Sequence, residues 1–353
     1  MVKEMNHVHS FDYQFLKYDM PAELLGISGM IFDLKARDTI RRSQNVDMLK
    51  KLREAAMIES VKGSNAIEGI VTTGKRLTAL VQQDEKPLNH AEEEILGYKN
   101  ALSEIYHDDF DAELSEALLK HFHQLLLSSV SAEAGFYKRE NNWIQERNEA
   151  GRLKVRFVPV SAKETPEAMA QWVMAWNEGR QDSKVNRLLL IPCAILDFLC
   201  IHPFTDGNGR ISRLITIVML QQAGFDIGRY ISLEAKINEY KYGYYRALKE
   251  SSAGWHENSS DYLPFITYFL QILYACYKEM DEKFIDGSIR RLPKHQQVEN
   301  VLRNSFVPVS KSEILQRLPD ISATTVERVM ADMLKEGQIV KIGTFRNARY
   351  KVK

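Results

Sequence analysis

Hydrophobic positions along this chain recur mostly three and four residues apart, which is the spacing of one face of a helix. The pattern therefore predicts a mainly α-helical protein. We expect helices over residues 47–60, 89–106, 112–129, 165–178, 188–201 and 210–223.

Residues with known preferences for helix ends mark several of these boundaries. Asn89 stands three positions before Glu92, which is a capping-box pattern. Thr165 is a candidate N-cap because Pro166 suits the first turn of a helix, and Gly224 suits a C-terminal cap. Pro192 either kinks its helix or marks the true start.

A change of period interrupts the helical pattern between residues 143 and 161. Residues 153–158 alternate between polar and β-branched or aromatic side chains, and they follow a polar turn at residues 148–151. This arrangement predicts a short β-hairpin.

The composition changes again after Asp286. Residues 290–353 hold 13 Lys and Arg against 6 Asp and Glu, a net charge of +7. We expect helices over 294–304, from Ser310 onward and over 323–336, followed by strands over 338–342 and 348–352. Three helices and a two-stranded wing resemble a winged helix-turn-helix. Its third helix carries both bases and acids, so DNA binding and protein docking both stay open.

The overall composition is that of an ordinary globular protein, with 44% hydrophobic residues and a formal net charge of zero. This balance argues against global disorder and against nucleic acid or membrane as a partner of the whole chain. The three cysteines form no C-x-x-C pair, which fits a reducing compartment. The longest apolar run, 188–201, is too short to span a bilayer. We expect a soluble, cytoplasmic protein.

One glycine-rich loop concentrates the chemistry. In Asp206-Gly207-Asn208-Gly209-Arg210 the glycines permit the backbone to turn its N–H groups inward, which forms an anion-binding nest at the start of a helix. Arg210 and Arg213 are one helical turn apart, so both can reach that side. The loop is suited to a polyphosphate.

Two further groups complete a transfer site beside this nest. Asp206 is a hard oxygen ligand suited to Mg²⁺ that is shared with phosphates. His202 ends the preceding helix and can take a proton from a hydroxyl group near neutral pH. A base, a metal ligand and a phosphate cradle within nine residues indicate phosphoryl or nucleotidyl transfer.

The segment His202-Pro203-Phe204-Thr205-Asp206-Gly207-Asn208-Gly209-Arg210, with Arg213, resembles the H-P-F-x-D-G-N-G-R-x-x-R signature of the Fic family at every fixed position. The resemblance implies a helical Fic core that transfers AMP from ATP to a protein hydroxyl. It implies that His202 is the base and Asp206 the Mg²⁺ ligand. It also implies that Gly207, Asn208, Gly209 and Arg210 hold the phosphates.

The resemblance extends to both sides of the loop. Residues 134–139 resemble the A-G-x-Y-R segment that precedes the family's flap, so the hairpin is expected to be this flap, with target docking along Val155, Phe157 and Val158. Val160 replaces the flap's usual second proline. Residues 237–248 resemble the helix beside the adenine pocket, where Tyr244 and Tyr245 are either nucleotide contacts or core residues.

An inhibitory motif is also expected. Ser64-Asn65-Ala66-Ile67-Glu68-Gly69 resembles the family's [S/T]-x-x-x-E-[G/N] helix. Ser64 and Glu68 share a helical face, and Gly69 ends the turn. Glu68 paired with Arg213 would withhold this arginine from the ATP γ-phosphate. Asp38 and Glu92 are competing candidates for the same arginine.

These features divide the chain into an N-terminal region with the inhibitory helix (1–88), a Fic core (89–286) and a winged helix (290–353). The expected activity is AMP transfer to a protein Ser, Thr or Tyr, with self-modification included. Another nucleotide donor, AMP removal, and a DNA-binding regulator that senses nucleotide remain alternatives, although intact His202 and Asp206 argue against a pure sensor. The sequence leaves a homodimer open.

Overall fold

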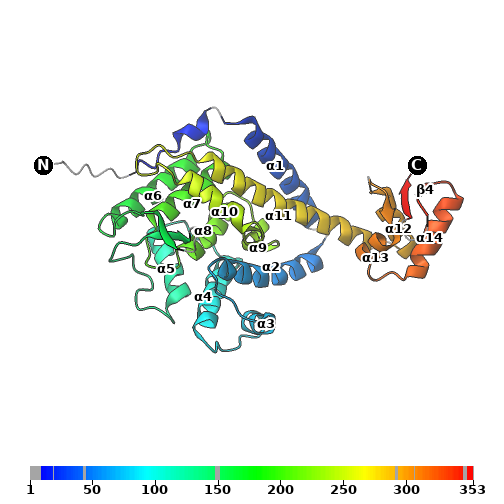
Figure 1. Cartoon of the computed structure of the whole chain (residues 1–353), viewed down its shortest axis with the longest axis horizontal. Coiled ribbons are helices and arrows are strands. Elements are labelled where there is room, and N and C mark those ends of the chain that lie inside the picture. The colour runs from blue at the N-terminus through cyan, green and yellow to red at the C-terminus, as the bar shows by residue number, and fades with distance from the viewer. Residues whose placement is uncertain are drawn as a thin grey trace. The chain divides into compact units, whose positions relative to one another are not determined.

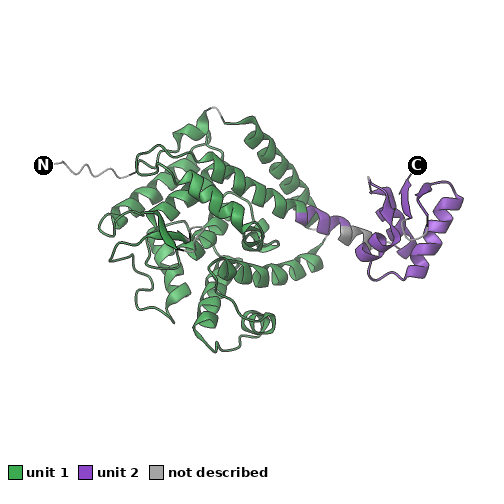
Figure 2. Ribbon diagram, in the orientation of Figure 1, with its two compact units in different colours: residues 1–278 green, residues 279–353 purple. Residues whose placement is uncertain are grey.

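The computed structural model describes residues 9–18, 20–42, 45–147, 152–290, 293–305, 307–344 and 348–352. The chain forms two compact units, residues 1–278 and 279–353 (Figure 2). The second unit therefore begins before Asp286, within the last helix of the first unit. The turn expected at residues 148–151 lies outside the described residues.

The first unit is mainly helical, as the spacing of hydrophobic residues predicted, with one small antiparallel sheet (Figure 1). Its helices and strands are η1 Gln14–Lys17, α1 Ala22–Arg42, α2 Val46–Ile67, α3 Gly74–Gln82, α4 His90–Ile105, α5 Glu116–Leu127, β1 Ile144–Arg147, β2 Leu153–Phe157, α6 Thr165–Gln181, α7 Arg187–Ile201, α8 Asn208–Gln222, η2 Ile227–Arg229, α9 Leu233–Glu239, α10 Lys241–Ser251 and α11 Leu263–Arg290.

Several predicted helix ends are wrong. The helix expected from residue 112 begins at Glu116, because the Ser115 side chain accepts a hydrogen bond from the Leu118 N–H and caps it. The N-cap of α6 is Glu164, and Thr165 is already helical. Pro192 lies inside α7 and does not mark its start, since the Asn186 side chain caps the helix.

The capping box expected at the start of α4 forms only by half. Asn89 accepts a hydrogen bond from the Glu92 N–H, as predicted. The Glu92 carboxylate instead accepts hydrogen bonds from Arg76, Thr72 and the Leu88 N–H. Arg76 and these other donors hold the pKa of Glu92 at about 2. This carboxylate ties α3 to α4, so it does not compete for Arg213.

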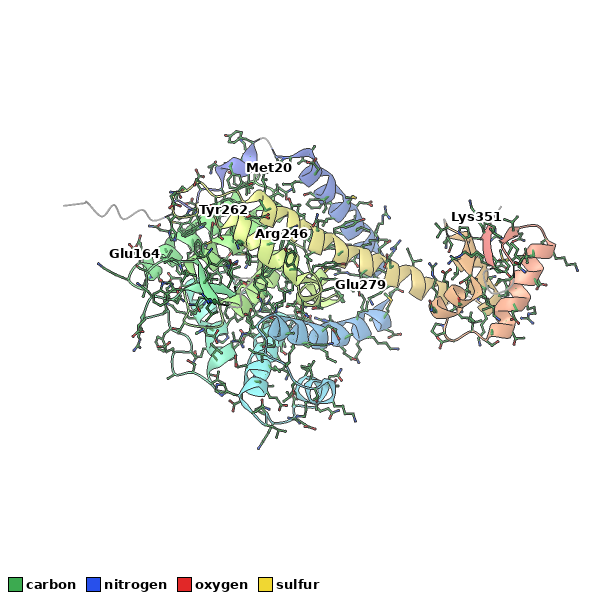
Figure 3. The ribbon with its side chains drawn as sticks, in the orientation of Figure 1. Met20, Glu164, Arg246, Tyr262, Glu279 and Lys351 are labelled. Atoms are coloured by element: carbon green, nitrogen blue, oxygen red, sulfur yellow. The ribbon has the colours of Figure 1, made fainter. Side chains whose placement is uncertain are left out.

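The core of the first unit is built around α7 and α8, which lie in its interior (Figure 1). Every residue of α7 from Leu188 to Ile201 is buried, including the carboxylate of Asp197. Asp197 accepts hydrogen bonds from Tyr13, Trp255 and Tyr262, the last of which precedes α11 (Figure 3). Burial raises the pKa of Asp197. This buried acid fixes α7, and thereby the end of the helix at which His202 lies.

The hairpin is confirmed as an antiparallel pair, β1 with β2. Its register is irregular, because Ile144 lies opposite Phe157 and Gln145 lies opposite Val155. One residue, Arg156, is therefore extra on β2, which makes a β-bulge.

The second unit contains α12 Lys294–Arg303, β3 Val309–Ser310, α13 Lys311–Arg317, α14 Ala323–Lys335, β4 Ile339–Ile342 and β5 Arg349–Val352. The expected helices and both expected strands are present, and the sequence missed β3, which pairs with β5. Ser310 and Glu313 form a capping box at α13. Val298, Ile314, Val326 and Met330 belong to a separate apolar core.

None of the helices in the described part of the chain is long and apolar enough to cross a membrane.

Candidate active site

The loop between α7 and α8 is shaped by two left-handed residues. His202 ends α7 with φ 51° and ψ 60°, and Gly207 precedes α8 with φ 77°. The Asn208 side chain closes the loop, because its amide oxygen accepts from the Phe204 N–H at 2.9 Å and its NH₂ donates to the Phe204 carbonyl at 2.7 Å. The side chain of Asn208 is thus engaged within the loop, and the residue also lines the cavity.

Phe204 anchors this loop in the core. It is fully buried, and the ring of His123 on α5 stacks on it with centroids 3.9 Å apart. The Gly135 N–H donates to His123 Nδ1, so Nε2 carries the proton and donates to the Asp206 carbonyl at 3.2 Å. Burial lowers the pKa of His123 to about 4. The neutral His123 ring therefore stabilises the loop by stacking on Phe204 and by its hydrogen bond to Asp206.

His202 is in the state that a general base requires. Its Nδ1 lies 3.2 Å from the Leu199 carbonyl, which can only accept, so Nδ1 carries the proton and the Nε2 lone pair is free. Burial lowers the pKa of His202 to about 4, and the positive charge of Lys138 adds to this effect. Lys138 itself donates to the Ile201 carbonyl at 3.1 Å, and burial lowers its pKa to about 8.

Asp206 offers one carboxylate oxygen to a ligand. Its Oδ1 accepts from the Gly207 N–H at 2.6 Å, while the side chain is 75% exposed and lines the cavity. No group of three or more His, Cys, Asp or Glu able to hold a metal occurs among the described residues. A single carboxylate suits Mg²⁺, which is held by one or two carboxylates together with phosphates and water.

Arg210 does not reach the cavity, contrary to the expectation that both arginines would face it. Its side chain is 1% exposed, and Nη1 donates to Glu94 on α4 at 2.6 Å. A weaker contact of 3.5 Å joins Nη2 to Asp206. Arg210 therefore fixes α8 against α4 and orients Asp206.

Arg213 lines the cavity, and two of its three guanidinium nitrogens bind α2 and its C-cap residue. Its Nε donates to the Ser64 hydroxyl at 2.8 Å, and its Nη2 donates to the Ser64 carbonyl at 3.0 Å and to Glu68 Oε1 at 2.8 Å. The other proposed competitor, Asp38, pairs with Arg42. Of the three carboxylates considered, Glu68 is the one that meets Arg213.

The end of α2 is held firmly in this position. Gly63 permits close contact with α9, since a Cβ there would lie 2.7 Å from the backbone of Glu234 and Ala235. Lys241 of α10 donates to the Ile67 carbonyl at 2.6 Å and so caps the C-terminus of α2. Glu68 follows as the C-cap residue, and Gly69 has φ 82°.

A cavity of about 270 Å³ joins these groups. The residues expected in the site that line it are Glu68, Phe157, His202, Asp206, Gly207, Asn208, Gly209, Arg213, Tyr244 and Tyr245. Val155 and Val158 of the hairpin are instead exposed, on the outside of the cavity. Tyr244 is buried, as a core residue would be, whereas Tyr245 is exposed, and the nucleotide contact stays a prediction for both.

Sequence reasoning missed four residues of the site: His123, Lys138, Arg156 and Lys241. Lys138 lies within the segment that resembled A-G-x-Y-R, so its position gave a signal. The other three act through contacts between elements distant in sequence, which no local pattern reveals.

The geometry defines a mainly helical protein whose cavity is bounded by a glycine-rich helix start, a neutral histidine and a short hairpin. Residues 113–220 match the model of the Fic/DOC family. This region, which includes the loop from His202 to Arg210 and Arg213, is therefore a Fic/DOC family region.

Similar proteins support this assignment. The protein adenylyltransferase Fic of Nematostella vectensis is 28% identical over 62% of this chain and 48% of its own length. The protein adenylyltransferase fic-1 of Caenorhabditis elegans is 30% identical over 22% of this chain and 16% of its own length. This chain therefore spans about half of the first relative and less of the second.

Solved structures show the same fold. A Fic family protein from Desulfovibrio desulfuricans G20 aligns with a TM-score of 0.64 at 21% identity, covering 96% of this chain and 98% of its own. A Fic domain containing signaling protein from Bacteroides thetaiotaomicron aligns with a TM-score of 0.60 at 22% identity, covering 71% and 96%.

Proposed function

We propose that this protein transfers AMP from ATP to a serine, threonine or tyrosine hydroxyl of a protein, itself included. The observation that carries the proposal is the meeting of His202, Asp206 and residues 207–209 on one cavity. The names of the curated relatives, protein adenylyltransferases, favour AMP as the group transferred.

Each group has a role that fits its environment. His202 Nε2 accepts the proton of the attacking hydroxyl, because the neutral ring has its lone pair free at physiological pH. Asp206 would hold Mg²⁺, which would neutralise phosphate charge. The N–H groups at the start of α8 would bind phosphate oxygens, aided by the helix dipole. The products are an AMP-modified protein and pyrophosphate.

The contact between Glu68 and Arg213 supports an autoinhibited resting state. Arg213 lies beside the start of α8, since a Cβ at Gly209 would lie 3.3 Å from its Nη1, and it donates hydrogen bonds to Ser64 and Glu68. A γ-phosphate would have to replace Glu68 as its partner. We infer that α2 must shift, or Glu68 must rotate, before ATP binds with its α-phosphate aligned for attack.

The hairpin is proposed to dock the target. In the sheet of β1 and β2, the outer edge of β2 has no neighbouring strand among the described elements. An extended target segment can add to such an edge through main-chain hydrogen bonds. Val155 and Val158, which are exposed, would contact its side chains, and Phe157 would lie at the cavity.

The second unit is proposed to be a winged helix that binds DNA. Its supporting features are the net charge of +7 over residues 290–353 and the exposed Thr324 and Arg328 on α14. Glu327 on the same helix is neutralised in part by Lys311. A filter-binding titration with salt tests this, because phosphate contacts give a steep salt dependence. If the protein retains no labelled DNA on the filter even at low salt, protein docking would be favoured instead.

The central experiment compares the chain with its Glu68→Gly and His202→Ala/Glu68→Gly variants, each incubated with Mg²⁺ and labelled nucleotides. We expect Glu68→Gly to modify itself with ATP and the double variant to be inactive. Mass spectrometry should find the mass of an AMP group, less water, on a hydroxyl side chain. Transfer from UTP in preference to ATP would identify another donor. Release of AMP from a modified protein by the unaltered chain would identify the reverse activity, and no transfer with any nucleotide would refute the proposal.

A further inference from the structure

The cations around the cavity differ in whether they are already paired. Arg213 is bound by Ser64 and Glu68, and Arg210 is turned toward Glu94. Arg156 of β2 also lines the cavity. No hydrogen bond or ion pair of Arg156 is found among the described residues. Its charge acts on Glu146, but that carboxylate pairs with Lys249 at 2.8 Å. Arg156 is thus a cation available to a ligand without displacing another group.

The β-bulge places this arginine in the cavity. In a regular strand, neighbouring side chains point to opposite faces. Here the extra residue between the pairs Gln145–Val155 and Ile144–Phe157 is Arg156, and both Arg156 and Phe157 line the same cavity. Bulges commonly redirect a side chain next to an active site. The register change therefore presents a charge and an aromatic ring to the ligand together.

Arg156 is close enough to His202 for its charge to act on the base. Burial is the main cause of the low pKa of His202, and the charges of Lys138 and Arg156 contribute in the same direction. Lys138 is buried and donates to Asn142 and Ile201, so it is not available to a ligand. Arg156 is therefore the cation that can bind ligand atoms next to His202.

We propose that Arg156 binds the phosphate group that is transferred, beside His202. This assignment rests on the proposed function and names a phosphate-binding residue of that site. The attacked phosphorus must lie near the base, because the hydroxyl that loses its proton forms the new P–O bond while the bond to pyrophosphate breaks. A guanidinium offers paired N–H donors to two oxygens of that phosphate. Its charge would bind the α-phosphate in the ground state and during transfer.

The test measures binding of ATP, AMP and adenosine to the full chain by calorimetry, in the Glu68→Gly background. Arg156→Gln should weaken ATP and AMP binding about tenfold or more, which is typical for loss of a hydrogen-bonded charge, and leave adenosine binding unchanged. Arg156→Lys should recover part of this loss and show that the hairpin still folds. Lys154→Gln removes the same charge from an exposed position of the same strand and should bind all three like the parent.

The possible outcomes separate this assignment from the proposed function. Equal ATP and AMP binding by Arg156→Gln and the parent would overturn the assignment. If Arg156→Gln binds ATP and AMP like the parent but loses protein modification, Arg156 would instead contact an acidic group of the target. This result would also overturn the assignment. If the parent binds no adenine nucleotide and transfers none, the proposed function itself fails.

Discussion

Glu68 at the end of α2 accepts a hydrogen bond from Arg213 of α8 at 2.8 Å, across 145 residues of sequence. The same guanidinium donates to Ser64, one helical turn earlier in α2. Two elements that flank the cavity are therefore joined through one arginine.

Replacing Glu68 by glycine should increase self-modification about tenfold or more, since a charge-assisted hydrogen bond that competes with phosphate is removed. The measurement is the initial rate of label transfer from ATP. Glu59→Gly is the matched control, because Glu59 is on the same helix and its partner is the exposed Lys62. Equal rates for Glu68→Gly and the unaltered chain would show that this contact does not restrain the site.

Gly209 and Glu68 should be coupled in stability. A Cβ at Gly209 would lie 2.3 Å from Glu68 Oε1, so Gly209→Ala must push the flexible carboxylate away from Arg213. We expect Gly209→Ala to lower the melting temperature of the unaltered chain and to change it less in the Glu68→Gly background. Additive effects in this double-mutant cycle would mean that the two groups do not interact in solution.

Lys241 should strengthen the restraint from outside the cavity. Lys241→Met removes the donor to the Ile67 carbonyl, so the last turn of α2 should open more readily and self-modification should rise severalfold. Lys62→Met removes an exposed lysine of α2 and should leave the rate unchanged. In the Glu68→Gly background, Lys241→Met should cause no further rise in self-modification, because both substitutions act on the same restraint.

Stability should fall with acid through the buried histidines. Burial lowers the pKa of His123 and of His202 to about 4, below the value of about 6.5 for an exposed histidine. The unfolded chain then binds more protons between pH 6.5 and 4, so the stability from these groups is present above pH 6.5 and is lost as pH falls to 4. Each of the two histidines should lower the free energy of unfolding by about 1–2 kcal/mol at pH 5.

This pH dependence is measured as the difference in unfolding free energy from urea titrations at pH 7.5 and pH 5. His123→Gln should reduce the difference, because glutamine cannot bind the proton. His121→Gln is the control, since His121 is exposed on the same helix. An unchanged difference in His123→Gln would show that His123 is not held neutral.

Helix content and the chemistry of the loop followed from local sequence. Helical spacing of apolar residues located α4, α7 and α8, and the alternation of residues 153–158 located β2. The helix ends differed from prediction, because the side chains of Ser115 and Asn186 accept hydrogen bonds from the exposed N–H groups of α5 and α7. Glu92 matched a capping pattern in the local sequence, yet its carboxylate accepts a hydrogen bond from Arg76 instead.

By itself, the sequence determined which residues form the loop from His202 to Gly209 and that Ser64 and Glu68 share a helical face. These are properties of spacing along one chain segment. Only the tertiary structure decided that Arg213 faces Glu68 while Arg210, three residues earlier, is buried against Glu94. It also decided that a bulge turns Arg156 into the cavity. The physical reason is that a side chain's partner is set by the packing of distant elements, which local periodicity does not encode.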